Sequence, residues 1–120
     1  MSNKITIEHI KDIYEQAEKV YLKRIDRKSA LDILSNKGIN RGSSSCYFLT
    51  ISDLLDGKSY TRTISEIAYR YIFEEILKKY GKERLDKALT AAAAHVEYYK
   101  RYSTLKSVTG VIEEYRKKCL

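Results

Sequence analysis

The sequence predicts an all-α protein in which residues 1–120 form a single helical domain. Proline is absent and glycines are few and cluster at expected turns, so helices can run between short connections. Hydrophobic residues make up 43% of the chain and recur at helical spacing, while no period-two alternation persists. We therefore expect a compact domain of five to six helices, with a helix-turn-helix-like pair at 26–55.

The first two helices follow from apolar spacing and from polar residues at their starts. Residues 6–24 are amphipathic, and Thr6 is suited to cap that helix. A second, shorter helix is expected after Asp26, another capping residue, and it should end at Gly38. The apolar positions expected to face inward are Ile7, Ile10, Ile13, Tyr14, Ala17, Val20, Tyr21, Ala30, Leu31, Ile33 and Leu34.

The third and fourth helices are predicted from capping patterns. Ser43 or Ser44 can cap a third helix over residues 44–55. Thr63 and Glu66 form the capping-box pattern that starts a fourth helix. The glycines expected to end these two helices are Gly57 and Gly81. The residues expected on their inner faces are Phe48, Ile51, Leu54, Leu55, Ile64, Ile67, Ala68, Tyr71, Ile72, Ile76 and Tyr80.

A fifth helix is expected directly after Gly81, and a sixth near the end of the sequence. Four alanines at 91–94 have high helix propensity and let a neighbouring helix approach closely. Ser103 or Thr104 should start the last helix, which Gly110 weakens by up to ~1 kcal/mol relative to alanine. The inner faces should hold Leu85, Ala88, Leu89, Ala92, Val96, Tyr99, Leu105, Val108, Ile112 and Tyr115.

Charge and composition narrow the classes of function. The chain has 23 basic and 16 acidic residues, and its net charge of +7 is compatible with a polyanionic partner such as DNA. Two cysteines without C-x-x-C spacing and two histidines argue against a zinc site and favour a reduced, cytoplasmic location. We find no signal peptide and no apolar run long enough to span a membrane, so we expect no membrane partner.

No constellation of residues predicts catalysis. The sequence has no P-loop, no G-x-G-x-x-G and no H-E-x-x-H, so we expect no enzyme activity from the chain by itself, no cofactor and no metal. His95 lies at the border of an apolar helix face, where a half-buried, hydrogen-bonded structural histidine is the usual outcome. An enzyme built around His95 is the weakest alternative, and it requires a concave pocket around that side chain.

The candidate binding site comprises the two turns that flank the third helix. The first turn, GINRGSS at 38–44, places an arginine beside a helix start whose free N–H groups favour an anion such as phosphate. A well-made helix–helix turn explains the same residues. The turn is longer than a standard one, and the third helix carries no Arg, Lys, Asn or Gln, which weakens base readout. The residues expected to contact DNA are Lys37, Asn40, Arg41, Ser43, Ser44, Tyr47, Lys58, Tyr60 and Arg62.

Two further groups are basic, and the tyrosine content supports a second interpretation. The basic groups are Lys23, Arg24, Arg27 and Lys28, and the aromatic-rich run Tyr98, Tyr99, Lys100, Arg101 and Tyr102. Eleven tyrosines with no tryptophan are equally expected of a non-catalytic protein-interaction module that dimerises or docks a partner through a tyrosine-rich helical face. A homo-oligomer is the partner that this alternative predicts.

The order of these motifs resembles a helical module that precedes the nuclease domain in bacterial restriction endonucleases of the HNH type. The pattern there is A-x-x-x-L, G-(M/I)-N-x-G-S-A, a tyrosine, G-x-x-Y-x-R, Y-G, A-L and H-x-x-Y-Y. The matching residues are Ala30, Leu34, residues 38–44, Tyr47, Gly57, Tyr60, Arg62, Tyr80, Gly81, Ala88, Leu89, His95, Tyr98 and Tyr99. Ser44 stands where alanine is usual, and the small size of serine should tolerate that change.

This resemblance covers roughly residues 30–100, and its motifs are specific as an ordered set rather than singly. No HNH metal site follows in this sequence, so nuclease activity does not carry over. The resemblance implies a DNA-recognition or accessory role in a restriction or phage-defence system, with a fused or associated nuclease as a partner.

Overall fold

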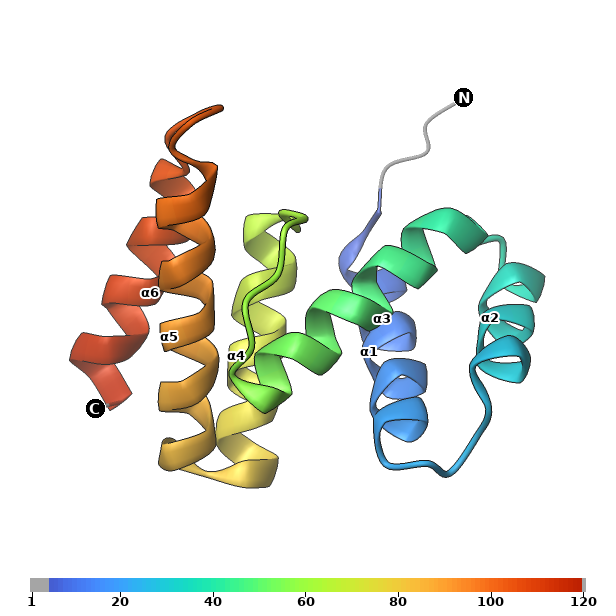
Figure 1. The fold of residues 1–120 in the computed structure, drawn as a ribbon. Helices are drawn as coiled ribbons and strands as arrows, with labels where there is room; N and C mark the ends of the chain where they lie inside the picture. Colours follow the sequence, from blue (N-terminus) through green and yellow to red (C-terminus); the bar gives the residue numbers. More distant parts are fainter. Residues whose placement is uncertain (1–4, 120) are drawn as a thin grey trace. The chain divides into compact units, whose positions relative to one another are not determined.

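The computed structural model describes residues 5–119, and every regular element in that range is an α-helix, which confirms the predicted all-α class. The helices are α1 (Ile7–Tyr21), α2 (Arg27–Asn36), α3 (Arg41–Asp56), α4 (Glu66–Tyr80), α5 (Lys82–Tyr99) and α6 (Lys106–Cys119) (Figure 1). The chain divides into two compact units at Ser52 and Asp53, within α3. Unit 1 ends at Ser52 and unit 2 begins at Asp53. A single domain remains a prediction.

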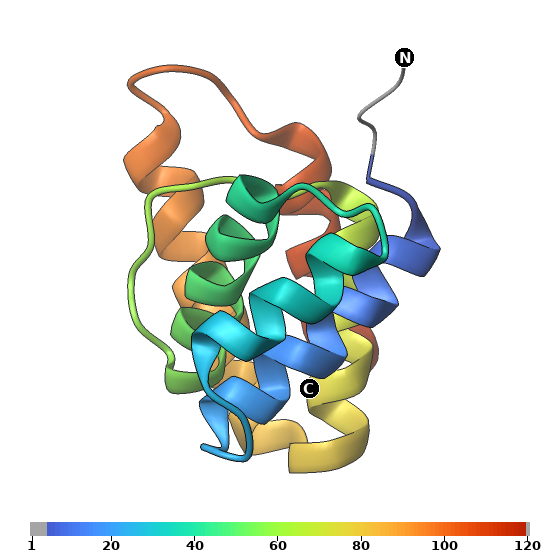
Figure 2. The same cartoon turned by 90° about the vertical axis from the view of Figure 1, so that its right-hand side faces the viewer.

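In unit 1, α1 and α2 pack side by side (Figure 2). Thr6 caps α1 as predicted, because its side chain accepts a hydrogen bond from the backbone N–H of His9. Asp26 likewise caps α2 through the backbone N–H of Ser29. The prediction that Ile7 and Ile33 face inward was wrong, since both are exposed at the edge of an otherwise correct apolar stripe. The buried side chains of these two helices are Ile10, Ile13, Tyr14, Gln16, Ala17, Ala30, Leu31 and Leu34.

The connection between α2 and α3 is a closed four-residue turn, Lys37 to Asn40. Gly38 has φ +84°, and the backbone N–H groups of Gly38 and Ile39 donate to the carbonyls of Ser35 and Leu34 at 3.0 Å each. These bonds form the motif that ends many helices, and buried Ile39 supplies its usual apolar contact. The prediction of a turn longer than the standard one was therefore wrong. The observed four-residue turn has a length found in helix-turn-helix pairs.

α3 begins three residues earlier than predicted because a different residue caps it. The Oδ1 atom of Asn40 accepts the backbone N–H of Ser43 at 2.9 Å, and the carbonyl of Asn40 accepts the N–H of Ser44 at 3.0 Å. Asn40 is thus the N-cap, in place of Ser43 or Ser44. Arg41 consequently occupies the first helical position rather than the preceding turn.

The start of α4 also differs from the prediction. Ser65 caps the helix by accepting the N–H of Ala68 at 3.2 Å, whereas the Thr63 hydroxyl bonds to His95 in α5. The buried face is rotated by about one position, because the large rings of Tyr69 and Phe73 enter the core. Among the residues expected on that face, Ile67 is 55% exposed, and Tyr71 and Tyr80 are half-buried.

In unit 2, α4, α5 and α6 pack against one another (Figure 1). Their core contains Ile72, Ile76, Leu85, Leu89, Ala92, Val108, Val111 and Ile112. Phe73 contacts the rings of Tyr69 and Tyr115 at centroid distances of 5.7 and 5.6 Å. Arg70 pairs with Glu66 at 3.2 Å and with Glu114 at 2.7 Å, so it joins α4 to α6. The sixth helix begins at Lys106 rather than near Ser103 or Thr104.

The C-terminal end of α3 belongs to unit 2. Gly57, with φ +70°, donates to the Leu54 carbonyl at 3.2 Å, and Lys58 donates to the Asp53 carbonyl at 2.8 Å. The Nε of Arg84 donates to the Leu55 carbonyl at 2.6 Å. The end of the helix is thus tied to α5. None of the helices in the described range is long and apolar enough to cross a membrane.

Candidate nucleic-acid interface

Two of the predicted phosphate ligands, Lys37 and Arg41, lie on the surface of unit 1 and are paired with carboxylates. The Nζ of Lys37 is 3.3 Å from Asp12 of α1, and the Nη1 of Arg41 is 2.7 Å from Asp32 of α2. The Arg41 hydrogen bond holds the pKa of Asp32 below its usual range. Ion pairs between side chains as exposed as these contribute little to stability and are screened by salt.

The other predicted residues of the first turn separate into exposed and buried sets. Asn40 is exposed and Ser43 is half-buried, but the side chain of Asn40 is engaged as the cap of α3. Ser44 is 0% exposed and Tyr47 is 8% exposed, so neither is presented to an external partner. The buried Ser44 hydroxyl has no hydrogen-bond partner.

The second predicted turn lies in unit 2 and contains Lys58, Tyr60 and Arg62. Lys58 is exposed, with its Nζ 3.9 Å from Asp56. Arg62 is exposed and forms no hydrogen bond or ion pair with the described residues, whereas Tyr60 is buried at 6% exposure. Tyr60 therefore anchors the connection between α3 and α4, and Arg62 lies on its outer surface. The two predicted turns belong to different units.

His95 is the centre of a hydrogen-bonded network, which we call the imidazole network. It comprises the buried residues His95, Tyr60 and Tyr69 and the exposed residue Thr63. Its Nδ1 is 2.9 Å from the Tyr60 carbonyl and its Nε2 is 2.7 Å from the Thr63 hydroxyl. The imidazole stacks on the Tyr60 ring at 4.4 Å, and the Tyr60 hydroxyl lies 2.6 Å from that of Tyr69. Four side chains from three segments thus hold residues 60–63 against α4 and α5.

The geometry of this network fixes the protonation of the ring. A carbonyl oxygen can only accept, so Nδ1 carries the proton, and in the neutral ring Nε2 accepts the hydrogen bond from the Thr63 hydroxyl. Burial lowers the pKa of His95, although the bond to the Tyr60 carbonyl opposes that shift. At 1% exposure and with both nitrogens engaged, His95 holds the chain in place and is not open to a substrate.

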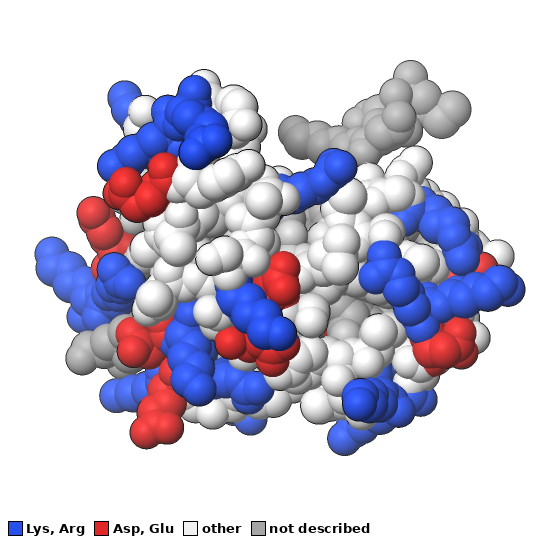
Figure 3. Space-filling model, in the orientation of Figure 1, with Lys and Arg blue, Asp and Glu red and all other residues white. Residues whose placement is uncertain are grey.

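Positive charge is concentrated in residues 23–41, which we call the basic segment. This segment holds six basic and two acidic residues, so it carries +4 of the net charge of +7. In Figure 3, basic side chains surround a smaller acidic area over α2. Lys28 and Arg41 share the single carboxylate of Asp32, and Arg27 donates to the neutral hydroxyl of Ser45. The local carboxylates therefore leave much of this charge uncompensated.

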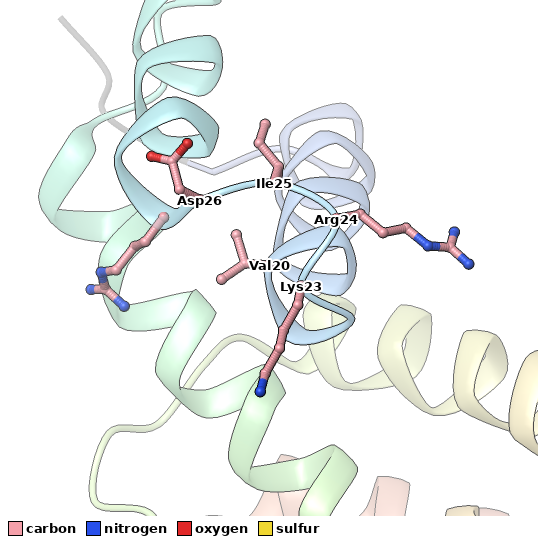
Figure 4. A pocket seen from close by; sticks show the side chains of 6 residues that line it. Val20, Lys23, Arg24, Ile25 and Asp26 are labelled. Atoms are coloured by element: carbon pink, nitrogen blue, oxygen red, sulfur yellow. The ribbon is translucent and has the colours of Figure 1, made fainter.

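An open pocket lies at the α1–α2 connection within the basic segment (Figure 4). Its lining residues are Val20, Lys23, Arg24, Ile25, Asp26 and Arg27. The side chains of Lys23 and Arg24 point in different directions, so they do not converge on one small anion. Lys23 adopts φ +59°, where it closes the C-terminal end of α1 by donating its N–H to the Val20 carbonyl at 3.0 Å. The cationic groups of Lys23 and Arg24 therefore point away from one another rather than toward a common centre.

Of the eleven tyrosines, nine are buried or half-buried, and only Tyr98 and Tyr102 are exposed. The tyrosine enrichment thus reflects the interior more than a broad contact surface.

Within residues 5–119, no three His, Cys, Asp or Glu side chains gather in a way that could hold a metal ion. Comparisons with protein-family models, with curated proteins and with solved structures find no match for this chain.

Proposed function

We propose that this chain is a DNA-binding module that contacts the phosphate backbone through the basic segment. The observation that carries the proposal is the concentration of +4 of the net charge in residues 23–41, with few carboxylates to balance it. Lysine and arginine contacts to phosphates release counterions and supply most of the affinity that does not depend on sequence. The diverging cations at the α1–α2 connection suit an extended polyanion better than a small anion.

The α2–turn–α3 pair supports the same function. The four-residue turn is of helix-turn-helix length, and Arg41 stands at the first position of the second helix. That helix start would meet the DNA, with Lys37 and Arg41 exchanging their carboxylate partners for phosphates. After Arg41 the helix has no Arg, Lys, Asn or Gln, so we propose backbone contact with little reading of bases.

An accessory or recognition role in a restriction or phage-defence system, with an associated nuclease, is a proposal that rests on the motif resemblance alone. Gly38 and Asn40 both have structural roles in the turn, since Gly38 ends α2 and Asn40 caps α3. Gly42 lies close to that cap, because an added Cβ would approach the Asn40 Oδ1 to 3.1 Å. These roles explain the motif without DNA, so the motif itself adds no support for DNA binding.

The test is fluorescence anisotropy with a labelled random-sequence duplex, titrated at several salt concentrations. We compare Arg24→Ala, Lys28→Ala, Arg41→Ala with a control of equal charge loss on unit 2: Lys78→Ala, Lys82→Ala, Lys117→Ala. The first variant should bind more weakly, and its log–log salt slope should flatten by up to about 0.9 for each phosphate that is no longer neutralised. Equal reductions in affinity in both variants, or no wild-type binding at low salt, would rule out the proposed interface.

The alternative is a protein-interaction module with a tyrosine-rich face. Five tyrosines are buried and four are half-buried, which removes most of the surface on which that interpretation depends. The salt dependence of binding distinguishes the two proposals, because apolar association persists at high ionic strength whereas phosphate contacts weaken. Self-association measured by analytical ultracentrifugation at high salt would favour the alternative.

A further inference from the structure

The exposed tyrosines gather at one place in unit 2, at the end of α5 and in the turn that follows. Tyr98 is 39% exposed and Tyr102 is 65% exposed, with their ring centroids 6.3 Å apart. The Arg101 guanidinium lies over the Tyr98 ring, 5.2 Å from its centroid. We call Tyr98, Arg101 and Tyr102 the tyrosine platform. It is an exposed aromatic surface with a cation built into it.

The side chains of Tyr99 and His95 contact the rings of the tyrosine platform and hold them in place. Half-buried Tyr99 contacts the rings of Tyr102 and His95, each at 5.5 Å, and its carbonyl accepts the N–H of Tyr102 at 2.9 Å. The His95 ring also lies 6.3 Å from that of Tyr98. Because the imidazole network holds His95 in place, the exposed rings are arranged before any ligand arrives. A prearranged surface loses little conformational freedom on binding.

The charge around the platform points to its ligand. Residues 98–112 include three basic residues and no acidic residue. Glu97, just before them, pairs with Lys100 at 2.8 Å. Arg101 and Lys106 have no ion-pair partner among residues 5–119. Lysine is depleted at protein–protein interfaces, whereas exposed aromatic rings beside cations without carboxylate partners suit unpaired bases and their phosphates.

We infer that the tyrosine platform binds single-stranded nucleic acid. An unpaired base stacks on the Tyr98 and Tyr102 rings, and the flanking phosphates meet Arg101 and Lys106. Stacking accepts any base, so the surface has little sequence preference. The platform shares no residue with the basic segment, and it gives the chain a second mode of binding that requires unpaired bases rather than a duplex.

The test uses the full chain with a fluorescein-labelled oligothymidylate and with a duplex of equal length, both by anisotropy. Tyr98→Ala, Tyr102→Ala removes the rings, and the matched control Tyr98→Phe, Tyr102→Phe keeps them. Both positions are exposed, and circular dichroism checks that each variant is folded. The alanine variant should lose at least about fivefold in affinity for the oligothymidylate, while the phenylalanine variant stays within about twofold of wild type. Duplex affinity should remain unchanged in both.

Three outcomes would overturn the inference. They are oligothymidylate binding that is unaffected by the alanine variant, no oligothymidylate binding by the wild type at low salt, and self-association that the alanine variant abolishes. The last outcome would assign the platform to a second copy of the chain. Failure of the duplex proposal is separately visible, because the basic-segment variant would then leave duplex binding unchanged while the alanine variant of the platform still weakens binding of the oligothymidylate.

Discussion

The basic segment and the imidazole network use polar side chains in opposite ways. In the basic segment the charges are exposed, their carboxylate partners are few, and two cations share Asp32. In the imidazole network His95, Tyr60 and Tyr69 are neutral and buried, and both nitrogens of His95 are engaged. The contrast teaches that the polar groups which stabilise this chain are distinct from those that could bind a polyanion. Loss of a charge in the basic segment should therefore weaken binding of a polyanion, and substitutions in the imidazole network should lower the free energy of unfolding.

Removing the imidazole should have the largest effect. His95→Ala leaves the Tyr60 carbonyl and the Thr63 hydroxyl without their partner and opens a cavity beside the Tyr60 ring. We expect the free energy of unfolding to fall by about 3 kcal/mol, measured by urea denaturation. Tyr60→Phe is the milder control, with a loss of about 1 kcal/mol for its hydroxyl bond to Tyr69. A His95→Ala variant as stable as wild type would contradict the structural role of the network.

Lys23 allows charge and backbone geometry to be separated in the basic segment. Its φ of +59° is strained for a side-chain-bearing residue, so Lys23→Gly should raise the free energy of unfolding by about 0.5 to 1 kcal/mol. Lys23→Ala removes the same charge but keeps the strain, and it should not stabilise. If Lys23 contacts DNA, both variants should weaken duplex binding equally. Unequal binding would mean that the turn conformation, rather than the charge, contributes.

The pH dependence of stability should separate the two regions as well. Because burial lowers the pKa of His95, the unfolded chain binds the proton more tightly than the folded one. Stability contributed by the network is complete above the unfolded value of 6.5 and falls as the pH decreases through that value toward the lowered one. Urea midpoints between pH 5 and 7.5 should show this slope in wild type and a smaller slope in His95→Asn. The opposite slope would indicate a charged imidazole.

Breaking the surface ion pair should have the smallest effect on stability. The side chains of Arg41 and Asp32 are 45% and 49% exposed, and Lys28 remains beside Asp32 when Arg41 is removed. Arg41→Ala should therefore leave the urea midpoint within experimental error. A marked loss would show that the pair is structural and would weaken the case for its exchange with phosphate.

The sequence predicts the helices well because the determinants of most of them are local. Thr6, Asp26, Gly38, Gly57 and Gly81 fulfil their predicted boundary roles. At the start of α4 the prediction failed because a distant group competes for the local cap. Thr63 has a suitable capping-box neighbour in Glu66, yet its hydroxyl binds His95, which lies 32 residues away in sequence. No local sequence pattern predicts His95 as the hydrogen-bond partner of Thr63.

The candidate site was only partly predictable for a related reason. Residue type indicates which side chains can bind phosphate or stack on a base, but it does not indicate which are exposed. Tyr47, Tyr60 and Ser44 stand at motif positions that predict contact with DNA, and they prove to be buried. Tyr98 and Tyr102 lie in a run whose interleaved aromatic and basic residues are visible in the sequence, and tertiary packing leaves their rings exposed.

The two histidines fall one in each unit, and they occupy chemically different surroundings. His9 completes the capping box of α1, with its Nδ1 3.3 Å from the Thr6 backbone nitrogen, whereas His95 is enclosed in unit 2. Their imidazole resonances in a nuclear magnetic resonance spectrum are therefore built-in reporters, one for each unit, and need no introduced label. Followed through a denaturant titration, coincident disappearance of the native signals would identify a single cooperative folding unit, and separate transitions would identify two.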